Sequence, residues 1–101
     1  MNYKIEVKQQ ALEDLVQAAV WYEMQSTGLG ERFANEYRST TERIKQNPLN
    51  YQVKRNNLRQ TQLKKFPYLI IYTIEGNTII IYGVIHGKRH SRKKYQLKKR
   101  R

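Results

Sequence analysis

The chain opens with alternating apolar and polar residues and then changes to a helical period. Tyr3, Ile5 and Val7 alternate with polar neighbours, which predicts a first strand. From residue 11 onward the apolar residues recur at helical spacing and form a stripe expected to face the core: Leu12, Leu15, Val16, Ala19 and Tyr22. The pattern therefore predicts a strand followed at once by an amphipathic helix.

A second helix is predicted after the glycine-containing break STGLGE at 26–31, with Thr27 as its N-cap. Its apolar stripe consists of Phe33, Tyr37, Thr40 or Thr41, and Ile44. The stripe stops at Asn47-Pro48, because a residue that precedes proline disfavours helical geometry. Two successive amphipathic helices with a short connection indicate a helical hairpin packed on a sheet.

The second half of the chain has the character of strands. Residues 58–66 alternate weakly, whereas 67–74 and 78–86 are rich in Ile, Val and Tyr and are separated by a turn at Gly76-Asn77. The predicted order is β-α-α-β-β-β, an α+β domain in which the helical hairpin covers one face of a small antiparallel sheet. We expect one domain over residues 1–101, with a basic C-terminal tail at 88–101.

The last strand carries a histidine at its end. If the strand is regular, Ile80, Tyr82, Val84 and His86 share one face, and His86 lies beside Tyr82. A half-buried histidine in this place either caps the strand or takes part in chemistry.

Composition adds a strong asymmetry of charge to this picture. Residues 1–50 hold six Lys or Arg against seven Asp or Glu, a net charge of −1, whereas residues 51–101 hold fourteen against one, a net charge of +13. This field favours a polyanionic partner, nucleic acid or an acidic protein segment, unless the basic run is only a solubilising tail. The absence of an apolar signal segment and of a membrane-length apolar stretch predicts a cytoplasmic protein with no membrane contact.

Several kinds of chemistry are excluded by the residues present. The chain has no cysteine and only two histidines, so neither a thiolate metal site nor a zinc site is expected, and no cofactor is predicted. Carboxylates are nearly absent from the basic half, which disfavours paired-carboxylate hydrolysis and a carboxylate-bound magnesium. A nuclease built from these residues has to work without metal, through Lys, Arg, His or Tyr.

Three residues near the C-terminus are the candidates for catalysis. Arg89 follows Gly87 and can hold a phosphate with its planar guanidinium, or it is a surface arginine. Tyr95 can stack on a base, transfer a proton or anchor the tail, and His86 can assist. The candidate nucleic-acid contacts are Arg59, Lys64, Lys65, Lys88, Arg92 and Lys93.

Five segments in order resemble the RelE/ParE superfamily, the toxins of bacterial type II toxin–antitoxin modules, some of which are named plasmid stabilisation proteins. They are ALEDLVQAAVWYE, GLGERF, NPLNY, FPYLIIYTI and IIIYGVIHGKR. The resemblance implies a growth inhibitor that a cognate antitoxin holds inactive. It also implies one of two targets, because RelE-like members cleave mRNA on the ribosome without metal and ParE-like members inhibit DNA gyrase.

The residues leave both targets open. The spacing of Arg89 and Tyr95 resembles the RNA-cleaving branch, in which they would hold the scissile phosphate and transfer a proton. Leu69 stands where that branch has another arginine, which favours gyrase inhibition. Our first hypothesis from sequence is an endoribonuclease, because the basic half suits ribosomal RNA. The second is a non-catalytic gyrase inhibitor, and the third is a basic nucleic-acid-binding module without toxicity.

Overall fold

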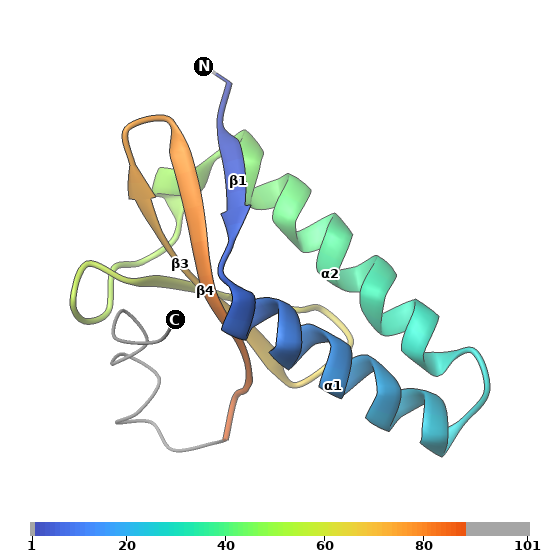
Figure 1. Cartoon of the computed structure of the whole chain (residues 1–101). Coiled ribbons are helices and arrows are strands. Elements are labelled where there is room, and N and C mark those ends of the chain that lie inside the picture. Colours follow the sequence, from blue (N-terminus) through green and yellow to red (C-terminus); the bar gives the residue numbers. More distant parts are fainter. Residues whose placement is uncertain (1, 89–101) are drawn as a thin grey trace.

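A four-stranded sheet with two helices on one face makes up the described part of the protein (Figure 1). The computed structural model describes residues 2–88. The elements are β1 (Lys4–Val7), α1 (Gln9–Gln25), α2 (Leu29–Gln46), the 3-10 turn η1 (Pro48–Asn50), β2 (Arg59–Gln62), β3 (Tyr68–Glu75) and β4 (Thr78–His86). The predicted α+β class and the order β-α-α-β-β-β are confirmed.

The sheet is mixed, with strand order β1-β4-β3-β2. Strands β2, β3 and β4 are antiparallel, as predicted, whereas β1 runs parallel to β4 from the pair Lys4–Thr78 to the pair Val7–Ile81. The sequence pattern predicted an antiparallel sheet throughout. No tight turn links β1 to its neighbour, because both helices follow it, so hairpin geometry does not set its direction.

The β3–β4 hairpin is the centre of the sheet. Its turn contains Gly76 at φ +60°, a left-handed conformation that glycine adopts without a steric penalty, and the predicted turn is confirmed. Both strands are buried over most of their length because apolar clusters lie on each face of the sheet. The near-continuous apolar character of residues 67–74 and 78–86 is thereby explained.

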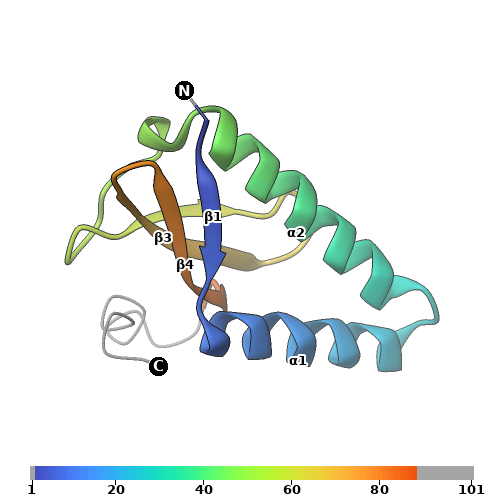
Figure 2. The same ribbon diagram turned by 45° about the horizontal axis from the view of Figure 1, so that its top comes forward.

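The main core lies between the sheet and the helical hairpin, which crosses the same face of the sheet in both views (Figures 1 and 2). Phe33, Ile44, Tyr72 and Ile81 are among its largest fully buried members. The smaller cluster on the opposite face contains Leu58, Leu69, Ile71, Ile80 and Tyr82. The two clusters hold β3 and β4 from both sides.

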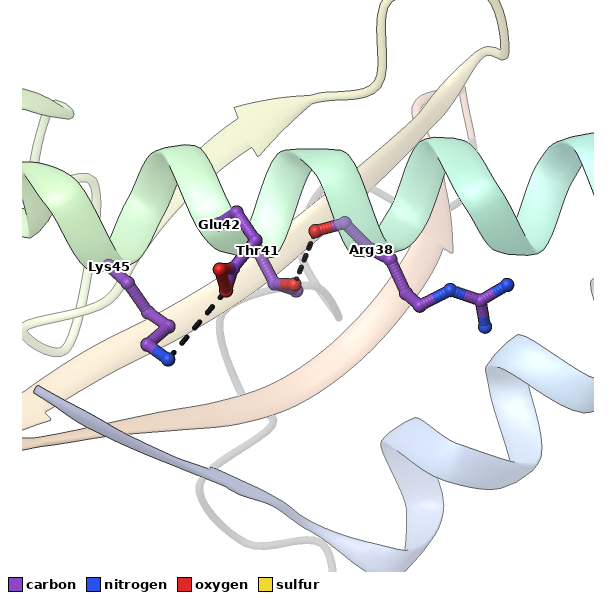
Figure 3. Close-up of polar contacts among 4 residues, drawn as sticks. All are labelled: Arg38, Thr41, Glu42 and Lys45. Atoms are coloured by element: carbon purple, nitrogen blue, oxygen red, sulfur yellow. Dashed lines mark hydrogen bonds and ion pairs between the residues drawn. The ribbon is translucent and has the colours of Figure 1, made fainter.

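Helix α2 buries the stripe that the sequence predicts. Phe33, Tyr37 and Ile44 are buried, and so are both threonines, Thr40 and Thr41. The Thr41 hydroxyl donates to the Arg38 carbonyl at 2.8 Å (Figure 3). The Thr40 hydroxyl donates in the same way to the Glu36 carbonyl. Figure 3 also shows the exposed ion pair between Lys45 and Glu42, 3.7 Å apart, one turn further along α2. Bonding back to the helix is how a threonine satisfies its hydroxyl inside a core.

Helix α1 does not bury the predicted stripe. Ala11 and Ala18 are the residues that are fully covered, whereas Leu12 is 51% exposed and Val16 is 54% exposed. The contact face is therefore displaced around the helix, and Leu15, Ala19 and Tyr22 lie at its border. The hydrophobic stripe was wider than the surface available to it, because α1 lies over only part of the sheet.

The connection between α1 and α2 is stabilised by a carboxylate. Glu23 accepts hydrogen bonds from the backbone N–H of Gly28, at 2.9 Å, and of Gly30, at 3.0 Å. The predicted N-cap at Thr27 is wrong, since Gly28 occupies the cap position at φ +90°. A negative charge at the start of α2 also suits the positive end of the helix dipole.

Candidate functional site

A β-bulge determines where His86 lies. The register between β3 and β4 shifts at Ile71–Tyr72, so Val84 joins the cluster under the helices together with Ile81. Tyr82 belongs to the cluster on the opposite face. The predicted placement of His86 beside Tyr82 is therefore wrong, because one extra residue reverses the facing of every later side chain.

The bulge directs the end of β4 into a cavity of about 580 Å³ beside α1. The residues that line this cavity, which we call the α1 pocket, are Asp14, Gln17, Ala18, Trp21, Tyr22, Pro67, Tyr68, Val84 and His86. They come from α1, from the start of β3 and from the end of β4. Of the predicted catalytic residues that the structure describes, His86 is the one in this pocket.

Asp14 joins α1 to β4 at the edge of the pocket. Its Oδ2 accepts a hydrogen bond from the Val84 N–H at 3.2 Å, and its Oδ1 accepts one from the Gln10 side chain at 3.4 Å. Strand β1 pairs with β4 only as far as Ile81. The Asp14 carboxylate accepts its hydrogen bond from the part of β4 beyond the end of β1.

Four aromatic rings form a continuous wall of the α1 pocket. The rings of Trp21 and Tyr22 meet edge to face, with their centroids 5.1 Å apart, and the centroids of Tyr22 and Tyr68 are 6.0 Å apart. The rings of Tyr68 and His86 also meet edge to face, with their centroids 5.4 Å apart. Trp21 is 55% exposed, so its indole borders both the pocket and solvent. Edge-to-face contacts of this kind fix the rings relative to one another.

His86 closes the turn at the end of β4. Its Nδ1 accepts a hydrogen bond from the Lys88 backbone N–H at 3.2 Å, and its ring packs on Tyr68. This contact leaves the proton of the neutral ring on Nε2. The arrangement matches the capping alternative that the sequence left open. A catalytic role for His86 stays a prediction.

The predicted basic contacts have different environments. The Arg59 guanidinium donates to the carbonyls of Leu49 and Tyr51, and it thereby fixes the loop after η1. Lys64, Lys65 and Lys88 are exposed. Lys65 borders a second hollow, beside α2. Arg59 is thus already engaged, whereas the three lysines are exposed to solvent.

Four of the predicted residues lie outside the described residues: Arg89, Arg92, Lys93 and Tyr95. Their predicted roles in phosphate binding and proton transfer stay predictions.

Leu69 stands where the sequence resemblance leads one to expect an arginine in the RNA-cleaving branch. It is 7% exposed and pairs with Gln62 on β2 and with Ile85 on β4. It packs in the apolar cluster on the face opposite the helices. An arginine at this point would have to enter an apolar environment, which is costly without a paired charge.

The tyrosines whose acidity is altered are buried or partly buried. Burial raises the pKa of Tyr37 and of Tyr22, with a further contribution from Tyr68 in the case of Tyr22. Burial also raises the pKa of Tyr72 strongly, and Arg59 opposes this rise in part. A raised pKa keeps each phenol neutral at physiological pH, so these tyrosines are suited to packing and not to proton transfer.

Two further properties bear on function. Within residues 2–88, no group of three or more His, Asp or Glu side chains is arranged to hold a metal ion. Neither of the helices in this part of the chain is long and apolar enough to cross a membrane.

Comparison with known proteins gives the class of the chain. The model of the family described as ParE toxin of type II toxin–antitoxin system, parDE, matches residues 5–91. A solved structure of the chromosomal ParDE toxin–antitoxin system from P. aeruginosa aligns with a TM-score of 0.63 and 17% identity, covering 83% of this chain and 95% of that chain. The E. coli toxin RelE, as a double mutant in the free state, aligns with a TM-score of 0.64 and 11% identity over 100% of both chains. No curated protein sequence matches significantly.

The fold and these matches define a toxin of the RelE/ParE superfamily, as the sequence resemblance predicted. Within it, the chain belongs to the ParE toxin family, whose model covers most of its length. Membership of a toxin–antitoxin family implies an antitoxin as partner.

Proposed function

We propose that this toxin inhibits DNA gyrase by binding to it, without cleaving RNA. The observation that carries the proposal is Leu69, which is buried and apolar where the RNA-cleaving branch has an arginine. The match to the ParE family points in the same direction. This reverses the order of preference that the charge of the second half suggested.

The environment of Arg59 supports the same proposal. Two of its hydrogen bonds go to the carbonyls of Leu49 and Tyr51, and these hold the segment before β2 in place. A guanidinium used in this way has fewer N–H groups left for a phosphate. Leu69 has no charge with which to stabilise a cleaved RNA backbone, and Arg59 has fewer N–H groups left to do so.

Ribosome-dependent mRNA cleavage is the second candidate, and the net charge of +13 over residues 51–101 favours it. In this case Arg89 would hold the scissile phosphate, Tyr95 would transfer a proton and His86 would assist. The exposed Lys64 and Lys65 would contact the RNA backbone.

The two candidates are separated by inducing the toxin in a bacterium and comparing wild type with Tyr95→Phe. Gyrase inhibition predicts altered supercoiling or DNA breaks within minutes, intact mRNA, and equal toxicity of the two proteins. RNA cleavage predicts early loss of mRNA, and an activity on the order of 10²-fold lower for Tyr95→Phe because only the hydroxyl is removed. Early mRNA cleavage by wild type that Tyr95→Phe lacks would overturn the gyrase proposal.

A further inference from the structure

The α1 pocket has an unusual charge for this chain. The whole protein carries a formal net charge of +12, yet the lining residues that belong to the described part of the chain, 2–88, include one carboxylate, Asp14, and no Lys or Arg. Helix α1 itself contains Glu13, Asp14 and Glu23 and no basic residue. A pocket with this lining repels phosphate and attracts a cation.

The aromatic wall adds a second feature that suits a cation. The faces and edges of Trp21, Tyr22, Tyr68 and His86 line one pocket, and Trp21 is accessible from solvent. A guanidinium or ammonium group is attracted to the face of an aromatic ring, most strongly to that of tryptophan. A carboxylate beside the rings can accept hydrogen bonds from the same group, as in other charge-assisted pairs.

The chain itself supplies such cations next to the pocket. His86 lines the pocket, and the described residues end two positions later, at Lys88. Residues 89–101 contain eight Lys or Arg, and the first of them, Arg89, follows His86 by three residues, about 10 Å of extended chain at most. Any of the first few cations after Lys88 is therefore close enough to enter the pocket without a change in the sheet.

We propose that the α1 pocket is a binding site for a cationic side chain, and that its occupant is an Arg or Lys from residues 89–101 of the same chain. The aromatic wall and Asp14 hold that side chain and fix the direction in which the basic segment leaves β4. The proposal concerns the position of the basic segment and does not depend on the target of the toxin.

The chain is well suited to a direct test because it has no cysteine and one tryptophan, Trp21. A nitroxide spin label is attached to Glu13→Cys on α1, next to Asp14, in the full-length protein. We expect the amide NMR signals of residues 89–94 to lose most of their intensity, and to regain it when the label is reduced. A label at Ser39→Cys, on α2, serves as the matched control and should leave these signals nearly unchanged.

The role of the carboxylate is tested with Asp14→Asn, which keeps an oxygen that can accept from Val84, and with Glu31→Gln on α2 as the control. In the labelled protein, Asp14→Asn should restore the signals of residues 89–94, and Glu31→Gln should not. Raising the salt concentration should change Trp21 fluorescence in wild type and much less in Asp14→Asn, since salt screens the attraction.

Equal broadening from the two labels, or no effect of Asp14→Asn, would overturn the proposal. A third outcome would also overturn it. If residues 89–94 are unaffected but N-acetyl-arginine amide changes Trp21 fluorescence in wild type and not in Asp14→Asn, the occupant comes from another molecule.

Discussion

Gly30 shows how a single residue sets the distance between the two helices. A Cβ at this position would lie 2.5 Å from the backbone oxygen of Ala19 and 3.0 Å from the Cβ of Glu23. Glycine is therefore required at position 30 because the helices pack closely there. At position 28 it is favoured by the backbone, whose φ is +90°. A side chain has no room at Gly30, and at Gly28 it would strain the backbone.

Gly30→Ala is expected to destabilise the protein by about 1–3 kcal/mol, because the methyl group meets backbone that cannot move freely. The helical preference of alanine offsets part of the cost. Urea unfolding measures the change, and Ser39→Ala on the exposed side of α2 should stay within about 0.5 kcal/mol. Equal stability of Gly30→Ala and wild type would contradict the tight helix crossing.

Tyr72 connects the core to η1. Its hydroxyl donates to the Pro48 carbonyl at 2.7 Å, and its side chain is fully buried. Tyr72→Phe keeps the ring and leaves that carbonyl without this donor, so we expect a loss of about 1–2 kcal/mol at neutral pH. Urea unfolding of the two proteins at pH 7 gives the difference.

The same pair of proteins should respond differently to alkaline pH. Burial raises the pKa of Tyr72 above its ordinary value of 10.0, so above pH 10 the unfolded chain releases this proton and the folded chain does not. The contribution of Tyr72 to stability is present below pH 10 and declines as the pH rises further, by about 1.4 kcal/mol per pH unit. Tyr72→Phe lacks this decline. Parallel stability curves above pH 10 would contradict the burial of the phenol.

At the scale of elements, α1 differs from α2 in how much of its apolar surface is covered. Ile44 of α2 is fully buried, whereas Val16 of α1 is 54% exposed. Ile44→Ala should therefore cost about 2–5 kcal/mol, and Val16→Ala should cost less than about 0.5 kcal/mol. Urea unfolding compares the two, and a similar loss for both would mean that α1 is covered more fully than the structure shows.

The periodicity of apolar residues predicted which helices and strands form. It did not predict strand pairing or the β-bulge, which depend on contacts between distant parts of the chain. Helix α2, the β3–β4 strands and the turn at Gly76 follow from local patterns and were predicted correctly. The parallel pairing of β1 depends on a partner more than 70 residues away, and the bulge depends on how β4 fits beside β3. Neither has a local signal.

The candidate site was only partly accessible to sequence reasoning for the same reason. His86 was singled out correctly as the end of the last strand, but its neighbours Asp14, Trp21 and Tyr68 were not, because the bulge brings them together. The helical period around position 14 does not single out this aspartate. Its contact with the Val84 N–H is visible only in three dimensions.

At the scale of the whole molecule, the asymmetry of charge suggests how the antitoxin binds. We expect an acidic segment that folds on the toxin and pairs with cations of the second half, such as Lys64 and Arg89. Co-expression with the adjacent open reading frame should give a complex that co-purifies and should restore growth. Higher salt should slow association more than it speeds dissociation. An adjacent product that neither binds nor restores growth would contradict this expectation.

The central claim, that the toxin acts by binding gyrase, is tested most directly by the supercoiling of relaxed plasmid DNA with purified gyrase and increasing amounts of the toxin. We predict that supercoiling is lost as the toxin approaches the concentration of gyrase, and that Tyr95→Phe inhibits as well as wild type. Full supercoiling activity in the presence of excess folded toxin, under conditions in which the same preparation arrests growth or cuts ribosome-bound mRNA, would contradict the claim.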